Sequence, residues 1–380
     1  MNLKLGWFGK VWLLRATAAL LFLTGTGTFL FSQDQAKFED LVEQASAARN
    51  QNDTARAIEL YSQAVELNPN WPQGWWFLGF LQYTQGSYAA ARDALSKFIL
   101  LTSEPGPAIA LRGICEFETG EYEKSLADIQ LGMSSGAAND PRSEQFFRSR
   151  EAMLLTRLGR FDQALKSYSF FAQRKVTDPE LLVAVGLAAL RRPLLPKEVG
   201  TDREMLEQVG SAVFAFLAGD ESTAKQQFQS LLGRFPGTPN MHYVYGFFLF
   251  ASDPEAALSE FQSELQLSAS NENAQVMTAW VLLLENHAPD ALSYAREAQE
   301  KHPELAAAQL VLGRALSETG DPKTGLTYLH KAAQLDPDDL EIHIALAKSY
   351  SRTGDRLDAQ RERRICLEMT KDGTNRLALP

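Results

Sequence analysis

Apolar residues recur along this chain at the three- and four-residue spacing of amphipathic helices, and the helices repeat in pairs about every 34 residues. The clearest unit covers residues 72–105. It opens with the apolar stretch at residues 75–83, reaches a turn at Gly86, and continues into a second apolar helix. A chain of such units predicts an all-α protein in which each helix pair buries its apolar face against its neighbours.

A small residue stands at the same place in the first helix of every unit. Two antiparallel helices approach closely only where no bulky side chain lies between them, so this position predicts the closest contact of each pair. A glycine recurs seven residues later, where the helix is expected to end in a left-handed backbone conformation. The small residues are Ala45, Gly79, Gly113, Ala152, Gly186, Ala212, Gly246, Ala279, Gly313 and Ala347, and the turn glycines are Gly86, Gly120, Gly159, Gly219, Gly320 and Gly354.

Trp75, Leu78, Gly79 and Ala91 match the pattern W-x2-L-G-x2-Y…A-x3-F…P, so the unit resembles the tetratricopeptide repeat. The resemblance covers about residues 38–370. It implies a right-handed superhelical solenoid of about ten antiparallel helix pairs, one of them degenerate. The repeats are expected to start near residues 38, 72, 106, 145, 179, 205, 239, 272, 306 and 340.

The fifth repeat departs from the pattern. Pro193 and Pro196 follow its first helix, where a turn and a second helix are expected, and two prolines three residues apart do not fit inside a regular helix. We therefore predict one array at residues 33–192, an irregular link at 193–204, and a second array with a terminal capping helix at 205–380. A degenerate repeat and a hinge between two arms are both compatible with this pattern.

Residues 1–32 have the order of an export signal. Lys4, Lys10 and Arg15 come first, no acidic residue is present, and an apolar run and small residues follow. The run after Arg15 is shorter than the ~20 residues of a typical membrane-spanning helix. Cleavage after Ser32 would give an exported soluble protein, periplasmic or secreted, which is the favoured interpretation. Retention of the segment would instead anchor the repeats to the inner membrane.

Charge and motif content exclude several functional classes. The net charge of −10 does not favour nucleic acid as a partner. Cys115 and Cys366 are the only cysteines and are expected to be packed as small apolar residues, and the five histidines do not pair at metal-ligand spacing. His242 and His343 occupy the place of Trp75, which predicts helix packing. We expect no catalytic residues, no cofactor and no metal site.

The resemblance implies that the second, fifth, ninth and twelfth positions of each first helix line a concave surface. In this chain those positions carry large aromatic side chains in two zones, one in the second and third repeats and one in the seventh and eighth. Such rings would anchor a partner, or neighbouring first helices would bury them mutually. The candidate partner-binding residues are Trp76, Phe80, Tyr83, Phe117, Tyr243, Phe247, Phe250 and Trp280.

These observations favour a non-enzymatic scaffold that binds a partner protein or peptide outside the cytoplasm. A membrane-tethered assembly factor for an envelope complex is the alternative, since it would use the same concave surface and retain residues 1–32. An enzyme or a solute-binding protein is the least favoured possibility, because no constellation of reactive side chains accompanies the repeats.

Overall fold

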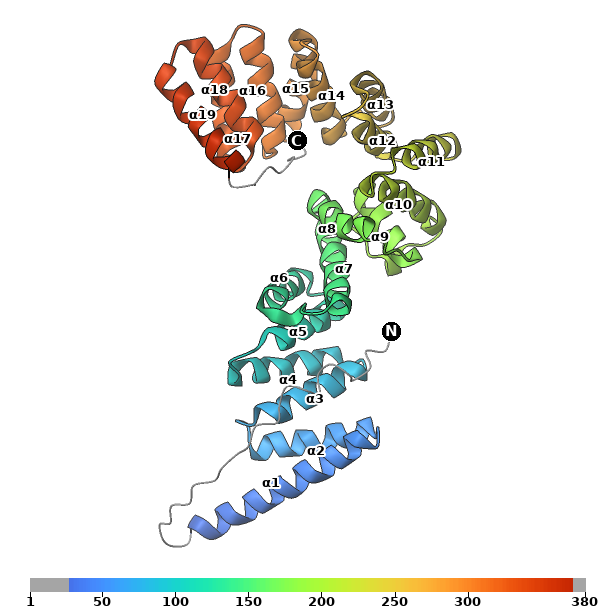
Figure 1. The fold of residues 1–380 in the computed structure, drawn as a ribbon, viewed down its shortest axis with the longest axis vertical. Helices are drawn as coiled ribbons and strands as arrows, with labels where there is room; N and C mark the ends of the chain where they lie inside the picture. Colours follow the sequence, from blue (N-terminus) through green and yellow to red (C-terminus); the bar gives the residue numbers. More distant parts are fainter. Residues whose placement is uncertain (1–26, 372–380) are drawn as a thin grey trace.

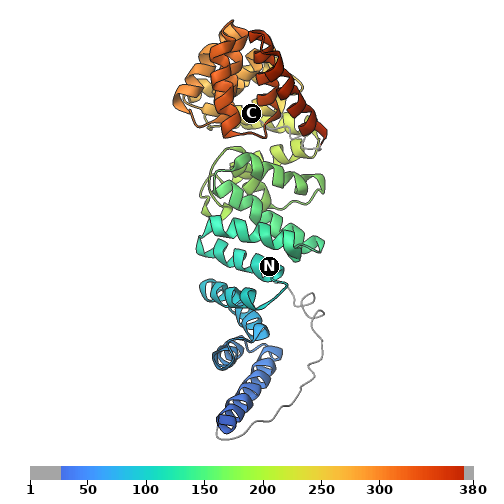
Figure 2. The ribbon, with the colours of Figure 1, turned by 90° about the vertical axis from the view of Figure 1, so that its left-hand side faces the viewer.

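The computed structural model describes residues 27–371, and within that range the chain is helical and contains no strand. Consecutive helices pack side by side and build an elongated solenoid in which the N-terminal and C-terminal repeats lie at opposite ends (Figures 1 and 2). The predicted all-α solenoid of helix pairs is confirmed.

Among the described residues, nine helix pairs and one additional helix make up the array, with one turn of π-helix and one of 3-10 helix. The additional helix is α9 (Pro179–Ala189), and the two short turns are η2 (Met133–Ala137) and η3 (Pro196–Glu198). The pairs are α1 (Gly27–Asn50) with α2 (Thr54–Leu67), α3 (Pro72–Thr84) with α4 (Tyr88–Leu101), α5 (Gly106–Thr119) with α6 (Tyr122–Gly132), α7 (Pro141–Arg157) with α8 (Phe161–Gln173), α10 (Arg203–Leu217) with α11 (Glu221–Arg234), α12 (Met241–Leu249) with α13 (Pro254–Leu267), α14 (Glu272–Leu284) with α15 (Ala288–Lys301), α16 (Ala306–Glu318) with α17 (Pro322–Leu335), and α18 (Leu340–Thr353) with α19 (Arg356–Lys371).

In the helix pairs that carry glycine at the small position, this glycine lies against the second helix, as predicted. A Cβ atom added at Gly79 would stand 2.9 Å from Cγ of Leu95, and one at Gly313 would stand 2.7 Å from Cγ of Leu329. Real side chains do not tolerate such contacts without movement, so a larger residue here would separate the pair. The six predicted turn glycines all have positive φ angles, between 75° and 103°.

The fourth residue of four repeats makes the same hydrogen bond. The indole Nε1 of Trp75 donates to the carbonyl of Pro69 at 2.8 Å, six residues earlier. In later repeats this donor is Gln275, Gln309 or His343, and each bonds the carbonyl six residues before it at 2.6–2.9 Å. The shared task is therefore to fix the loop between repeats, and three different side chains perform it.

The two histidines at this place also bond the second helix of their own repeat. Nδ1 of His343 lies 2.8 Å from Glu362 of α19, and Nδ1 of His242 lies 2.6 Å from Glu260 of α13. The prediction that both histidines are helix-packing residues is confirmed.

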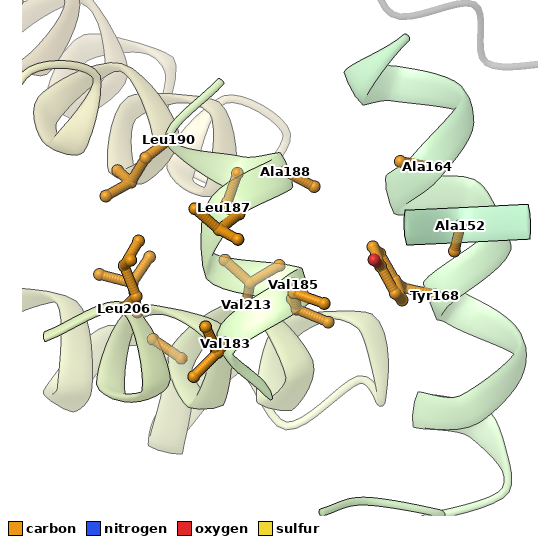
Figure 3. Close-up of a cluster of buried hydrophobic side chains, with 14 of the residues drawn as sticks. Ala152, Ala164, Tyr168, Val183, Val185, Leu187, Ala188, Leu190, Leu206 and Val213 are labelled. Carbon is orange, nitrogen blue, oxygen red and sulfur yellow. The ribbon is translucent and has the colours of Figure 1, made fainter. Parts of the chain in front are cut away.

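The prolines after α9 interrupt the repeat pattern, but the packing continues. Helix α10 takes the place of the missing second helix: a Cβ atom at Gly186 of α9 would stand 2.1 Å from the carbonyl oxygen of Leu206 of α10. One at Gly210 would stand 1.8 Å from the carbonyl oxygen of Leu182. Helix α10 also pairs with α11, so one helix serves two repeats. Figure 3 shows Leu187 and other apolar side chains meeting at this junction.

Packing is weakest between α11 and α12, which approach each other closely at few backbone positions. A cavity of about 420 Å³ lies between α11, α12 and α13, and another of about 460 Å³ lies between α10, the end of α11 and the loop after it. Polar contacts hold the start of α12 against α13 instead. Glu264 is fully buried and accepts hydrogen bonds from the backbone amides of Asn240 and Tyr243 at 2.8 and 3.2 Å. The division into arrays at residues 193–204 stays a prediction.

Most of the expected export segment, residues 1–26, lies outside the described residues. The described part begins with α1, so the predicted cleavage site after Ser32 lies inside this helix. Across residues 27–371, every helix is too short or too polar to cross a membrane.

Candidate functional site

The eight aromatic residues chosen from the sequence fall into two groups by exposure. Phe117, Tyr243 and Trp280 are buried, with exposed fractions of 4%, 7% and 6%. The other five are half-buried: Trp76, Phe80, Tyr83, Phe247 and Phe250. The inner face therefore combines rings that belong to the core with rings that keep part of their surface in solvent.

The half-buried group has its largest rings on α3. Trp76 and Phe80, one helical turn apart, stack with centroids 6.2 Å apart and an interplanar angle of 21°. Phe98 of α4 supports the indole of Trp76 at 5.4 Å. Tyr83 lies one further turn along α3 and contacts the ring of Tyr88 at 6.0 Å. We call Trp76, Phe80 and Tyr83 the α3 aromatic row.

The second half-buried group is smaller and belongs to the junction around α12. Phe247 and Phe250 pack with part of their surface against the central core, and Phe250 also contacts the C-terminal core. We call these two residues the α12 aromatic pair. Helices α3 and α12 lie at different levels of the solenoid in both views, so the two groups are separate surfaces (Figures 1 and 2).

Each of the three buried aromatic residues is covered by at least one cationic side chain. Arg150 of α7 lies 5.3 Å from the ring centroid of Phe117, Arg191 lies 5.3 Å from that of Tyr243, and Arg314 lies 4.6 Å from that of Trp280. These distances allow cation–π attraction. A partner reaches the three rings only if the covering arginine moves.

Lys197 is a second cover for Phe117, with Nζ 5.4 Å from the ring centroid. Because Lys197 lies in the link between α9 and α10, its contact with α5 could not be recognised from repeat spacing. The sequence could have pointed to Arg314, since this residue occupies the ninth position of its repeat, which is expected to be an inner position.

Hydrogen bonds and charge strengthen the cover over Tyr243. Nη2 of Arg191 donates to the hydroxyl oxygen of Tyr243 at 3.2 Å and contacts Asp162 of α8 at 3.0 Å. Burial raises the pKa of Tyr243, although the charge of Arg191 opposes this shift. Tyr243 is thus a neutral hydrogen-bonding residue of the junction.

The electrostatics of the α3 aromatic row follow from its partial burial. Burial is the main cause that raises the pKa of Tyr83, and neighbouring Tyr88 adds to it. The ring therefore presents a neutral hydroxyl near the ends of α3 and α5. Within residues 27–371, no group of three or more His, Cys, Asp or Glu residues could hold a metal ion.

Two segments match the tetratricopeptide repeat family, at residues 42–107 and 306–349. The chain thus contains tetratricopeptide repeats. The first match contains the whole α3 aromatic row, so these aromatic residues lie within a recognised repeat.

A curated relative carries the same repeat in its name. It is the small glutamine-rich tetratricopeptide repeat-containing protein 2 of Mycosarcoma maydis, 26% identical over 121 residues. The match covers 32% of this chain and spans about a third, 34%, of the relative's length.

Solved tetratricopeptide-like solenoids are also similar to this chain. MamA from Desulfovibrio magneticus RS-1 is 21% identical, with a TM-score of 0.40 over 46% of this chain and 97% of the other. A chain of the APC/C hetero-tetramer Cut9–Hcn1 is 17% identical, with a TM-score of 0.41 over 90% of this chain and 68% of the other.

Proposed function

We propose that this chain is a non-enzymatic scaffold that binds a partner protein or peptide on the inner face of its first helices, outside the cytoplasm. The observation that carries the proposal is the stacked pair of Trp76 and Phe80, large rings that keep solvent-exposed surface on one face of α3. Aromatic side chains of this kind dominate the binding energy of protein interfaces. The tetratricopeptide repeats support the same role.

The α12 aromatic pair is the second contact surface in this proposal. It lies at another level of the solenoid from the α3 aromatic row, so one short peptide does not contact both (Figure 1). We infer a partner that either extends along the solenoid or binds each surface through a separate segment. The acidic net charge of −10 argues against nucleic acid as that partner.

Site-specific crosslinking tests the proposal in the native cell. A photoreactive amino acid is placed at Phe80 or at Phe247, and the crosslinked proteins are identified by mass spectrometry. The expected result is one protein recovered reproducibly from Phe80. Its recovery should fall by roughly tenfold when Trp76 is also changed to alanine, because truncating one central aromatic side chain commonly costs 1–2 kcal/mol or more.

Leu100 provides the control. It is 80% exposed near the end of α4, so a photoreactive residue there samples an apolar surface position outside the α3 aromatic row. Tyr243 is unsuitable as a test site because its truncation would disturb the core. The same proteins recovered from Leu100 and Phe80, or full recovery in the Trp76→Ala variant, would contradict the proposed site.

The location outside the cytoplasm rests on the charge and apolar order of residues 1–32. The alternative is a membrane-tethered assembly factor for an envelope complex, which would keep this segment. N-terminal sequencing of the protein purified from its native cells separates the two, since a chain that starts near residue 33 lacks the anchor. Recovery of the chain from the cytoplasm with Met1 intact would contradict both.

A further inference from the structure

The link between α9 and α10 reaches back to helices that precede it by many residues. Nζ of Lys197 lies 3.4 Å from Oε2 of Glu118 at the end of α5, a residue 79 positions earlier, and 5.4 Å from the ring centroid of Phe117. Oε2 of the next residue, Glu198, lies 3.7 Å from Nε of Arg157 at the end of α7. Thus the positive Lys197 faces the negative Glu118, and the negative Glu198 faces the positive Arg157.

Glu118 and Arg157 occupy the same place in consecutive repeats. Each is five residues after the small residue of its first helix, Gly113 in α5 and Ala152 in α7, and directly follows the twelfth position. The link therefore crosses the ends of two successive first helices and covers Phe117, one of the aromatic residues expected to bind a partner.

The link is anchored as a single turn of 3-10 helix, η3. Leu195 is 1% exposed, and its backbone amide donates to Oε2 of Glu198 at 2.7 Å, which fixes the carboxylate that contacts α7. The carbonyl oxygen of Pro196 accepts a hydrogen bond from Arg203 at 3.1 Å. In contrast, Lys197 keeps 53% of its side-chain surface exposed, and ion pairs at such positions stabilise only weakly.

We propose that residues 194–198, Leu-Leu-Pro-Lys-Glu, are a resident ligand of the concave face at α5 and α7, and that an external segment of the same chemistry competes for this surface. The inference rests on the proposed scaffold function and names the recognised partner feature: a lysine followed by a glutamate, held in a tight turn. In the free protein the link occupies the site, and the α3 aromatic row is left as the first contact for a partner.

Binding of a free peptide tests the proposal. Residues 194–199 are replaced in the full chain by glycine and serine at equal length, and circular dichroism confirms that the helix content is retained. A fluorescent peptide with the sequence of residues 192–200 is then titrated by anisotropy. We expect saturable binding to the replaced chain, with affinity at least roughly tenfold above that for the wild type, whose own link competes.

Charge reversal provides the specificity control. A peptide with the lysine and glutamate exchanged should bind the replaced chain roughly tenfold more weakly. Adding Glu118→Lys and Arg157→Glu to the replaced chain should restore the binding of the exchanged peptide. The same two changes should weaken the binding of the native peptide. Equal binding of both peptides, equal binding to wild type and replaced chain, or binding to neither would overturn the proposal.

A second measurement covers the case in which the replaced chain does not fold. Hydrogen exchange of the residue 198 amide, which donates to the carbonyl oxygen of Leu195 at 2.9 Å, is followed in the otherwise unaltered protein with Lys197→Glu and Glu198→Lys together. We expect exchange roughly tenfold faster than in the wild type, and slower again when Glu118→Lys and Arg157→Glu are added. Lys166→Glu, an exposed change on α8, is the control. Unchanged exchange in the reversed link would refute the resident contact, while crosslinking from Phe80 would still test the scaffold function independently.

Discussion

At the residue scale, four repeats share one hydrogen bond although the residue that makes it differs. In these four repeats the fourth position is tryptophan, glutamine or histidine, and each side chain donates to the loop carbonyl six residues before it. A sequence pattern that requires tryptophan misses this shared task. The buried histidines further show that a side chain placed for packing also pairs with a carboxylate when the second helix offers one.

Glu116 of α5 is a buried carboxyl group in an unfavourable electrostatic environment. It is 5% exposed, and its Oε2 atom has no hydrogen-bond partner in the described structure. The pKa of Glu116 is raised from 4.5 to about 7, mainly by burial and also by the charge of Asp128, while Arg112 opposes the shift. A carboxyl group with this environment is more easily protonated in the folded protein than in the unfolded chain.

The raised pKa predicts a loss of stability as pH increases. Below about pH 4.5 the Glu116 carboxyl is protonated in both the folded and the unfolded state, and its stabilising contribution is fully present. Between pH 4.5 and about 7 the folded state binds more protons, so the free energy of unfolding falls with rising pH. We expect the free energy of unfolding of Glu116→Gln to fall by about 2–3 kcal/mol less than that of the wild type between pH 5 and pH 8. Urea unfolding at the two pH values measures this difference.

Glu123→Gln is the matched control, since Glu123 lies on α6 with 67% of its side chain exposed. It should leave the pH dependence close to that of the wild type. If Glu116→Gln and the wild type lose the same stability between the two pH values, Glu116 is not the responsible group.

At the element scale, the crossing of α9 and α10 depends on glycines that bring two backbones together. The carbonyl oxygen of Leu182 lies where a Cβ atom of residue 210 would be, and a backbone carbonyl cannot rotate away as a side chain does. We expect Gly210→Ala to separate the helices and to lower the free energy of unfolding by about 3 kcal/mol, measured by urea unfolding.

Gly233→Ala in α11 tests whether the loss comes from crowding. No heavy atom lies within 4 Å of its Cβ position, so the helix propensity of alanine should stabilise the protein by up to about 1 kcal/mol. A similar loss in both variants would show that the close crossing at residue 210 is not the cause.

The same junction shows what the sequence could not predict about the fold. The prolines at residues 193 and 196 correctly signalled an interrupted repeat. They did not show that α10 packs on α9, because this requires Gly210, which lies outside the repeat pattern, to face Leu182 across the interruption. The turn glycines and the close contacts at glycines within the regular pairs followed from spacing alone, since each depends on residues within one repeat.

At the scale of the whole molecule, the candidate surface was only partly predictable. Repeat positions predict which face of each first helix turns inward, but they do not predict which aromatic rings keep exposed surface. That outcome depends on Arg150, Arg191, Arg314 and Lys197, which reach across from neighbouring helices or from the link. Long flexible side chains obey no repeat spacing, so only the folded chain shows where they rest.

The separate cores along the solenoid predict that damage to one repeat stays local. One core joins residues 41–94 and another joins residues 276–359, and no residue belongs to both. In such an array, stability is a sum of repeat and nearest-neighbour contributions. A Cβ atom at Gly313 would stand 2.9 Å from the carbonyl oxygen of Gly325, so Gly313→Leu should separate α16 from α17.

We expect hydrogen exchange in α16–α19 to become at least roughly tenfold faster in Gly313→Leu, while α1–α4 keep the protection of the wild type. Gly79→Leu is the mirror experiment, because it crowds Leu95 in the α3–α4 pair and should affect α1–α4 alone. If either variant raised exchange equally at both ends, the solenoid would unfold as one cooperative unit. Destabilisation of the C-terminal repeats would then also affect a partner bound at the α3 aromatic row. If the ends are independent, each contact surface unfolds locally without affecting the other.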